Sequence, residues 1–378
     1  MNKRYDYIII GAGCAGLSLA YRLRNMKFKI CIIESSNDVN LRNKTWSFWN
    51  TYNTPFNHLV RKKWEKMIIK NHSENKKIDC RKFNYHSIDS KDFNKFSLDK
   101  IEKNKNIDIK YMSKVINIKN NNNIIEVSTK QKEYECTHVF DSRPDTRKIY
   151  MQQQFYGVYV KTVENVFEDS TAVLMDFSKL KNKFHFMYVL PFSKNTALIE
   201  STYFSAKKET ECLDDKYIES YMASEYKNTK YSVEKKEYGS IPMDPNISNS
   251  SNNYITKIGA YSGATRASTG YTFINIQKQI DGITKSIKRN KHNTCKPNKY
   301  FHSFLLRKMD SIFLSIIKEN PDYMKTALLN LFRSKNHNSQ IRFLSDMPGI
   351  IDIIKIILYL PKKRFLKYAL GFHDKKNR

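Results

Sequence analysis

The segment 5–34 constrains the fold of this chain more than any other stretch. It begins with an apolar run of strand length, continues with Gly11-Ala-Gly13-Cys-Ala-Gly16, and ends with a second apolar run that reaches Glu34. A strand, a G-x-G-x-x-G turn, a helix-period segment and a second strand ending in an acid form the fingerprint of a dinucleotide-binding β-α-β unit. The segment therefore predicts a nucleotide cofactor at the first turn.

Each part of this fingerprint has a physical role. The first glycine permits the tight turn, the second lets the backbone approach a pyrophosphate, and the third lets the helix pack closely on the strand. Cys14 and Ala15 belong to the same turn, at the helix N-terminus, where free N–H groups favour an anion. Glu34 is placed to accept the ribose hydroxyls of the adenosine.

A second turn of small residues occurs late in the chain. It runs Ser262-Gly263-Ala-Thr-Arg-Ala-Ser-Thr269-Gly270-Tyr271, between a strand expected at 254–260 and a helix expected to end near 288. Such a turn presents backbone N–H groups and a helix N-terminus, so we expect it to contact the same cofactor.

The charge of the chain is unusual. Its 378 residues carry a formal net charge of +29. Nucleic-acid binding, attachment to a membrane surface and a simple compositional bias are all open explanations. The lysines are scattered rather than clustered on one module, which argues against a nucleic-acid partner.

The cysteines and the apolar runs limit the compartment. The six cysteines are Cys14, Cys31, Cys80, Cys136, Cys212 and Cys295. No CxxC pair or Cys/His cluster is present, so we expect neither a metal site nor a disulfide framework. The first strand begins too early for a signal peptide, and no apolar run approaches the roughly 20 residues of a spanning helix. We expect a cytoplasmic protein.

The middle of the chain favours an antiparallel sheet. Strand-like runs at 154–163, 172–175, 184–190 and 196–204 follow one another, and several alternate. Such a sheet offers one face to a ligand. The expected division is 1–80, 106–150 and 251–290 for the cofactor layer, 81–105 and 151–250 for the substrate layer, and 291–378 for C-terminal helices.

Two further stretches leave alternatives open. Lys44-Thr-Trp46-Ser-Phe-Trp49 has two tryptophans in an expected loop, so these rings line either a ligand pocket or a small satellite core. The segment 350–360 is almost wholly apolar and is followed by Pro361 and a basic run. It is either a buried terminal helix or an interfacial helix on a membrane.

Taken together, short motifs in a fixed order identify a family. They are the fingerprint, the Lys44 to Trp49 stretch, Asp141-Ser-Arg143, Leu174-Met-Asp176, Tyr188-Val-Leu-Pro191-Phe, Leu198-Ile-Glu200-Ser-Thr-Tyr203, Gly239-Ser-Ile-Pro242-Met and Ser268-Thr-Gly270-Tyr271. This order resembles that of the lycopene cyclases, the bacterial carotenoid β-cyclases, over nearly the whole chain.

The resemblance implies an α/β fold: a Rossmann-like FAD-binding domain of the aromatic-hydroxylase (glutathione-reductase-2) type, with an inserted antiparallel substrate sheet and C-terminal helices. It also implies non-covalent FAD, required in the reduced form, with NAD(P)H as reductant. The implied reaction is acid-catalysed cyclisation of the ψ ends of lycopene or a related acyclic carotenoid, at a membrane surface. The alternative is a polyprenyl or carotenoid reductase or hydroxylase on the same scaffold.

The resemblance also assigns roles to residues. Glu200, a charged residue inside an apolar strand, becomes the catalytic acid, although the pattern alone also allows a salt bridge or an exposed face. Asp176 is the second candidate, against a turn-capping role. We further expect Lys44, Asp141, Arg143, Ser262, Gly263, Thr269, Gly270 and Tyr271 to contact the cofactor, and Trp46, Trp49, Phe186 and Tyr188 to line the substrate pocket.

Two departures from the family pattern are visible. The turn at 259–263 lacks the Asp that many related flavoproteins place near the ribityl chain, so Ser262 or the backbone must serve. Many cyclases also carry two adjacent acids in the catalytic motif, and here the second position is Ser201. Glu200 is the only acid left at that motif.

Overall fold

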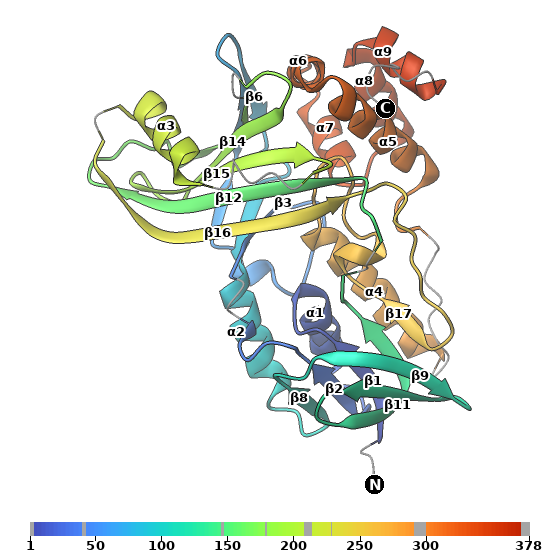
Figure 1. The fold of residues 1–378 in the computed structure, drawn as a ribbon. Coiled ribbons are helices and arrows are strands. Elements are labelled where there is room, and N and C mark those ends of the chain that lie inside the picture. Colours follow the sequence, from blue (N-terminus) through green and yellow to red (C-terminus); the bar gives the residue numbers. More distant parts are fainter. Residues whose placement is uncertain are drawn as a thin grey trace.

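The structure is a computed structural model, and it describes residues 4–39, 43–144, 147–177, 180–207, 214–227, 229–290 and 300–371. The predicted fold class is confirmed, with a Rossmann-like layer, an antiparallel sheet and C-terminal helices (Figure 1). Cys212 and Cys295 lie outside the described residues, and the other four cysteines are free thiols.

A mixed sheet forms the nucleotide-binding layer at the bottom of Figure 1, in the order β8-β2-β1-β11-β10-β9, with β17 beside β11. Its strands are β1 (Arg4–Ile10), β2 (Ile30–Ile33), β8 (Ile107–Lys110), β9 (Val115–Asn121), β10 (Ile124–Thr129), β11 (Glu133–Asp141) and β17 (Ile255–Lys257). β1 is parallel to β2 and β11. Its isoleucines are buried on both faces, as expected for a central parallel strand.

Three helices cover one face of this sheet. They are α1 (Cys14–Leu23), α2 (Ser90–Ile101) and α4 (Phe273–Asn290). α1 lies against both α2 and α4, and their apolar sides form one core with Ile9 and Ile32. A small sheet in the order β3-β7-β4 adjoins them, made of β3 (Thr45–Trp49), β7 (Tyr85–Asp89) and β4 (Lys62–Trp64).

A second large sheet crosses the molecule above this layer, in the order β16-β12-β15-β14-β13-β5-β6 (Figure 1). Its strands are β5 (Lys66–Lys70), β6 (Asn75–Asp79), β12 (Met151–Thr162), β13 (Thr171–Phe177), β14 (Phe184–Pro191), β15 (Thr196–Ser205) and β16 (Tyr231–Met243). All neighbours are antiparallel except β13 and β5. We call it the substrate sheet.

The two faces of the substrate sheet are covered differently. One face packs on α3 (Asp215–Glu225) through a core that includes Val158, Ile199 and Met222. The other face packs on C-terminal helices through residues such as Leu198 and Phe204. These helices are α5 (Phe304–Glu319), α6 (Pro321–Leu331), α7 (His337–Leu344), α8 (Ile350–Tyr359) and α9 (Lys362–Ala369).

Several elements differ from their expected places. β5 and β6 join the substrate sheet although 1–80 was assigned to the cofactor layer, and α2 packs on α1 although 81–105 was assigned to the substrate layer. Periodicity specifies that these segments are strands and a helix, but it does not specify their partners. The stretch from Lys44 to Trp49 is largely the strand β3 rather than a loop.

Two local backbone features shape the strands. β8 and β9 are separate strands, and Met112 between them adopts a positive φ of 52°. β16 continues past Tyr238, through Gly239 and Pro242, to Met243. Proline is tolerated there because β16 lies at the edge of its sheet.

A buried ion cluster fixes the C-terminal helices to the rest of the fold. Arg266, in the turn before α4, is completely buried. Its Nε donates to both carboxylate oxygens of Asp310 on α5 at 2.9 and 2.7 Å. Its Nη1 donates to Asp346 at 2.6 Å, just after α7. Together the arginine and the carboxylates join three separate segments.

We expect Arg266→Met to destabilise the protein strongly. The substitution leaves Asp310 and Asp346 buried without their charge partner, and breaking such a pair costs about 3–5 kcal/mol in the free energy of unfolding. Chemical denaturation measures this change. Arg81→Met is the matched control, because it breaks the exposed ion pair with Asp79 and should change stability little. Equal effects of the two substitutions would contradict the locking role of Arg266.

Candidate functional site

The first turn forms an open cradle at the N-terminus of α1. Gly11 has a φ of +96°, and a Cβ there would lie 2.3 Å from the Ser142 hydroxyl. A Cβ on Gly16 would lie 1.9 Å from the Gly11 carbonyl oxygen. A Cβ on Gly13, by contrast, would meet nothing within 4 Å. The turn is therefore closed on the protein side and free on the side where a pyrophosphate would approach the N–H groups of Cys14 and Ala15.

Glu34 stabilises this cradle directly. One of its carboxylate oxygens accepts a hydrogen bond of 2.8 Å from the Ala12 N–H, and the other accepts one of 2.9 Å from the Ser36 N–H. Burial raises the pKa of Glu34, but these hydrogen bonds outweigh burial, so the net pKa lies below the ordinary value. Glu34 is thus held ionised at the end of β2, beside the turn.

The second small-residue turn meets the first one. A Cβ on Gly259 would lie 3.1 Å from the Ala15 Cβ, so the two turns are in contact. Ser262 is buried, donates to the Gly259 carbonyl at 2.7 Å and accepts from Gln279 at 2.8 Å. Its side chain stabilises the turn, and Gly263 completes it with a φ of +90°.

Asp141 and Arg143 lie at the neighbouring strand end, where Asp141 pairs with Ile10. Arg143 Nη2 and Lys257 Nζ each lie 2.8 Å from the Asp141 carboxylate. Burial raises the pKa of Asp141, and the two cations together lower it below the ordinary value. These residues form an ion cluster at the strand end beside the cradle. Arg143 also donates a hydrogen bond to the carbonyl of Val115, the first residue of β9.

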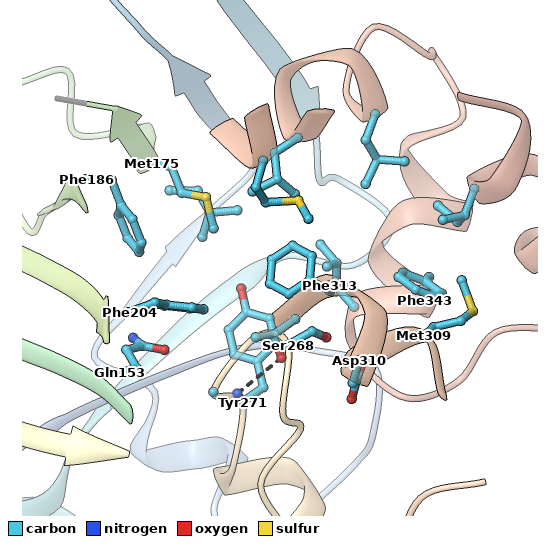
Figure 2. A pocket seen from close by; sticks show the side chains of 18 of the residues that line it. Gln153, Met175, Phe186, Phe204, Ser268, Tyr271, Met309, Asp310, Phe313 and Phe343 are labelled. Atoms are coloured by element: carbon cyan, nitrogen blue, oxygen red, sulfur yellow. Dashed lines mark hydrogen bonds between the residues drawn. The ribbon is translucent and has the colours of Figure 1, made fainter. Parts of the chain in front are cut away.

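A cavity of about 620 Å³ lies between the substrate sheet and the C-terminal helices. Figure 2 shows Phe186 and Phe204 on the sheet side and Met309, Phe313 and Phe343 on the helix side. Most of the lining is apolar and aromatic, as in sites that bind hydrocarbon ligands.

The turn before α4 forms part of the same cavity wall. Thr269, Gly270 and Tyr271 line the cavity, and a Cβ on Gly270 would lie 2.4 Å from the Gln153 side chain of β12. Thr45 and Ser47 of β3 line it as well. The cavity between the sheet and the C-terminal helices therefore extends to the place where the nucleotide-binding layer and the substrate sheet meet.

Glu200 is the buried acid of this cavity. It lies on β15, on the same face as Leu198, Thr202 and Phe204, and is 9% exposed. Burial raises the pKa of Glu200 well above its ordinary value, and the neighbouring Glu237 carboxyl raises it further, while Lys44 lowers it. Burial and the neighbouring carboxyl thus both favour the protonated form of Glu200.

A second carboxyl in the cavity wall is paired differently. Asp310 lines the cavity from α5, but both of its oxygens accept hydrogen bonds from Arg266. A carboxylate held by a guanidinium in this way is stabilised in its charged form. Glu200, and not Asp310, is therefore the candidate proton donor.

The sequence profile described as "Lycopene cyclase protein" matches residues 6–369. The chain belongs to the lycopene cyclase family. The resemblance found in the short motifs is thereby confirmed across nearly the whole chain. A comparison with curated protein sequences found no match.

Solved structures share the fold of this cyclase family member at low sequence identity. A geranylgeranyl bacteriochlorophyll reductase-like protein from Thermoplasma acidophilum has a TM-score of 0.60 at 11% identity, over 98% of this chain and 99% of that chain. A flavin-dependent brominase has a TM-score of 0.63 at 13% identity, over 98% and 100%. A p-nitrophenol 4-monooxygenase from Pseudomonas putida has a TM-score of 0.60 at 12% identity, over 98% and 98%. These likenesses show the fold alone.

The departure from the cyclase pattern at Ser201 has a structural explanation. Side chains alternate along β15, so Ser201 points to the opposite face from Glu200. There the Ser201 hydroxyl lies 2.9 Å from the His185 ring nitrogen. Position 201 could not present a carboxyl to the cavity in this strand.

Asp176 is not part of the cavity. It lies 3.0 Å from the Lys70 ammonium and accepts a hydrogen bond of 3.0 Å from Tyr221 on α3. Leu174 and Met175 line the cavity, and Asp176 does not. Burial raises its pKa, with Lys70 and Tyr221 acting in the opposite direction. It forms a half-buried ion pair within β13 rather than a turn cap, and it does not border the cavity.

The four predicted pocket aromatics divide into two pairs. Phe186 and Tyr188 line the cavity, and the Tyr188 hydroxyl lies 3.0 Å from that of Tyr85. Trp46 and Trp49 are not in the lining. Trp46 packs on Phe273 and Phe93, and Trp49 on Tyr85, in the apolar cores.

Lys44 lies at the edge of the cavity rather than beside the first turn. Its ammonium donates to the Tyr238 carbonyl and lies 4.9 Å from the centre of the Tyr238 ring. It is also close enough to Glu200 to lower the pKa of that carboxyl.

The sequence reasoning missed Gly157 and Glu237. Both lie in register with Glu200 on adjoining strands, in the order Glu200, Gly157, Glu237. Glu237 sits in a polar run, so local composition does not mark it as buried. The available signal was its place two residues before Gly239 of a quoted motif, on the inward side of an alternating strand.

Proposed function

We propose that this chain is a flavin-dependent lycopene β-cyclase that acts at a membrane surface. The observation that carries the proposal is Glu200, a buried carboxyl with a raised pKa in a large apolar and aromatic cavity. Cyclisation of an acyclic ψ end needs a strong proton donor in a dry site, because water would quench the cationic intermediate.

The residues of the cavity support each step of an acid-catalysed ring closure. Glu200 gives its proton to the terminal double bond, which becomes a tertiary cation. The neighbouring double bond attacks this cation and closes a six-membered ring, and a ring carbon then loses a proton. Phe186, Phe204 and Tyr188 can stabilise the cation through their ring faces. One proton enters and one leaves, so the net reaction is an isomerisation.

The cradle supports FAD as the cofactor. The open side of Gly13 and the N-terminus of α1 would hold the pyrophosphate, with Glu34 beside the adenosine ribose. Reduced FAD, supplied with electrons by NAD(P)H, would provide an electron-rich ring that stabilises a cation or relays a proton. Thr45 and Thr269 to Tyr271 lie where the two layers meet and would position its ring system.

A reductase or hydroxylase on the same scaffold is the second candidate. The likeness to a geranylgeranyl reductase-like protein favours it at the level of the fold. The two functions differ in stoichiometry. The cyclase forms product far beyond the reductant supplied, and one reductant consumed per product would identify the redox enzyme instead.

The exposed surface of α8 and α9 supports a membrane partner. The exposed apolar residues there are Ile350, Ile351, Ile354, Ile357, Leu358, Leu366 and Leu370. We call this surface the apolar face, and Lys362 and Lys363 are exposed beside it. Apolar residues flanked by basic ones suit a bilayer with anionic headgroups. In the described part of the chain, no helix has both the length and the apolar character to cross a bilayer.

The cavity reaches the surface at this apolar face. Ile357 and Leu366 line the cavity and are 48% and 59% exposed. Leu305 of α5 does the same at 48%. A water-insoluble hydrocarbon could therefore move from a bilayer into the cavity without crossing water.

We expect Gly13→Val to fold and to lose FAD. The backbone at Gly13 has a φ of −85°, which valine can adopt, and its Cβ would point into open space where the pyrophosphate approaches. Flavin absorbance of the purified protein gives the occupancy. Gly16→Val is the contrast, because its side chain would collide with the Gly11 carbonyl and disturb the turn itself. Normal flavin content in a folded Gly13→Val protein would contradict the cradle.

We expect Glu200→Gln to lose cyclase activity by about two to four orders of magnitude, because glutamine keeps the size of the side chain but cannot deliver a proton. Glu200→Asp should recover little, because a shift of about 1 Å in a catalytic group is itself costly. A lycopene-making host shows the result by chromatography of its pigments. Flavin content should not change. Asp176→Asn is the control, and activity should fall only in step with stability. Wild-type cyclisation by Glu200→Gln would place the proton source elsewhere.

We expect the protein to float with anionic liposomes, and more weakly at high salt. The double substitution Ile350→Asp and Ile354→Asp should abolish flotation, because it puts two charges on the apolar face at positions 80% and 52% exposed. Ile116→Asp with Val163→Asp is the matched control, at positions 58% and 75% exposed on other elements. Unchanged flotation of the folded first variant would exclude the apolar face as the anchor.

A further inference from the structure

A second buried carboxyl lies beside Glu200 and is not itself the proton donor in the proposed ring closure. This is Glu237 of β16, whose side chain is completely shielded from solvent. β12 separates the two carboxyl-bearing strands, and its Gly157 is the register partner of both residues. The two glutamates and the glycine therefore form one row across three strands.

Gly157 creates the space in which these carboxyls meet. A Cβ at position 157 would lie 2.7 Å from Glu200 Cγ and 3.3 Å from Glu200 Oε1. The Glu200 side chain thus lies directly over Gly157, on the same face of the sheet as Glu237, and the nearby Glu237 carboxyl raises the pKa of Glu200. Two buried carboxyl groups this close disfavour a double negative charge, so the pair is more stable when one of them carries a proton.

The surroundings decide which of the two carries it. Glu237 accepts a hydrogen bond of 3.1 Å from the Thr45 hydroxyl and one of 3.4 Å from the Thr45 N–H. The Lys235 ammonium lies 3.6 Å from the same carboxylate. These groups stabilise a negative charge on Glu237, whereas Glu200 borders an apolar cavity that disfavours one.

We propose that Glu237 is the positioning residue that keeps the proton on Glu200, and that the pair holds one proton and one negative charge. Glu237 stays ionised and accepts the hydrogen bond that the Glu200 carboxyl donates. This inference rests on the proposed function in one respect only, which is that the proton is delivered to a substrate carbon. When the Glu200 O–H bond breaks and its proton joins a substrate carbon, two like charges face each other across Gly157. Their repulsion favours return of one proton from the ring carbon to the pair.

Other titratable groups of the described residues lie around the pair. They are Lys44 of β3, Tyr85 and Asp89 of β7, Tyr159 of β12, Tyr188 of β14 and Lys235 of β16. Burial raises the pKa of each of the three tyrosines, so they stay neutral in the range where a carboxyl titrates. None of these tyrosines would therefore titrate near neutral pH, and loss of the signal in Glu200→Gln assigns a carboxyl titration to the glutamate pair.

Infrared difference titration of the flavin-loaded protein tests the pair. The C=O stretch of one protonated carboxyl should persist at neutral pH in the wild type and be lost in Glu200→Gln. In Glu237→Gln the same signal should titrate about 1–3 pH units lower, because the like charge is removed. The loss of cyclase activity with rising pH should move by the same amount, since only protonated Glu200 is active. Activity should partly recover in acid.

Two further variants make the outcome decisive. Glu234→Gln removes a charge from the exposed side of the same strand and should leave the titration unchanged. Gly157→Ala changes no charge but inserts a methyl group between the carboxyls, and should also lower the titration pH. It carries the test if Glu237→Gln does not fold. Glu237→Asp should restore part of the wild-type behaviour.

The possible results separate this inference from the proposed function. Unmoved titration in folded Glu237→Gln and Gly157→Ala proteins would overturn the pair, even if the protein cyclises lycopene. A shifted titration in a protein that never cyclises lycopene would sustain the pair and contradict the proposed function.

Discussion

The buried guanidinium of Arg266 is the interaction on which the rest of the structure depends. Apolar packing holds the C-terminal helices against the substrate sheet, but apolar contacts have no preferred direction. Arg266 supplies the direction, because its planar group fixes Asp310 and Asp346 at set angles. The same turn carries Gly270 and Tyr271 into the cavity wall. One charge network therefore joins the turn that lines the cavity to α5 and to the segment after α7.

Local sequence signals predicted the parts of the fold that depend on neighbouring residues. The first turn, most strands and the acid on β15 follow from glycines, alternation and one charge in an apolar run. Trp46 and Trp49 show the limit of such signals. Their aromatic character suggested a pocket, but the residues of this strand that line the cavity are Thr45 and Ser47, on either side of Trp46.

The parts that could not be predicted depend on pairing between distant segments. Glu237 lies in a polar run and becomes buried only because β16 pairs with β12 and Thr45 comes from β3. Gly157 has no signal of its own, since its importance comes from the side chain on the next strand. The sequence alone does not show that Glu200, Gly157 and Glu237 lie side by side. Their alignment becomes visible only when β15, β12 and β16 are paired in the sheet.

The fold is shared with proteins described as a reductase, a brominase and a monooxygenase, so it does not by itself choose a reaction. Two features distinguish this chain from other proteins of that fold. It belongs to the lycopene cyclase family, and its apolar cavity contains a buried acid. The proposed acid-catalysed reaction needs one group that resists ionisation. The substrate sheet places Glu200 where both burial and a neighbouring charge provide this resistance.

The apolar face also bears on how the protein behaves outside its setting. In water, exposed isoleucine and leucine side chains lower their free energy by contact with another apolar surface, and a second copy of the chain offers the same residues. Self-association would then cover Ile357 and Leu366, which border the cavity opening. In a purified sample without detergent or lipid, other copies of the chain would then block the cavity opening of each molecule. A low specific activity of such a sample would reflect this blockage and not a fault in the catalytic groups.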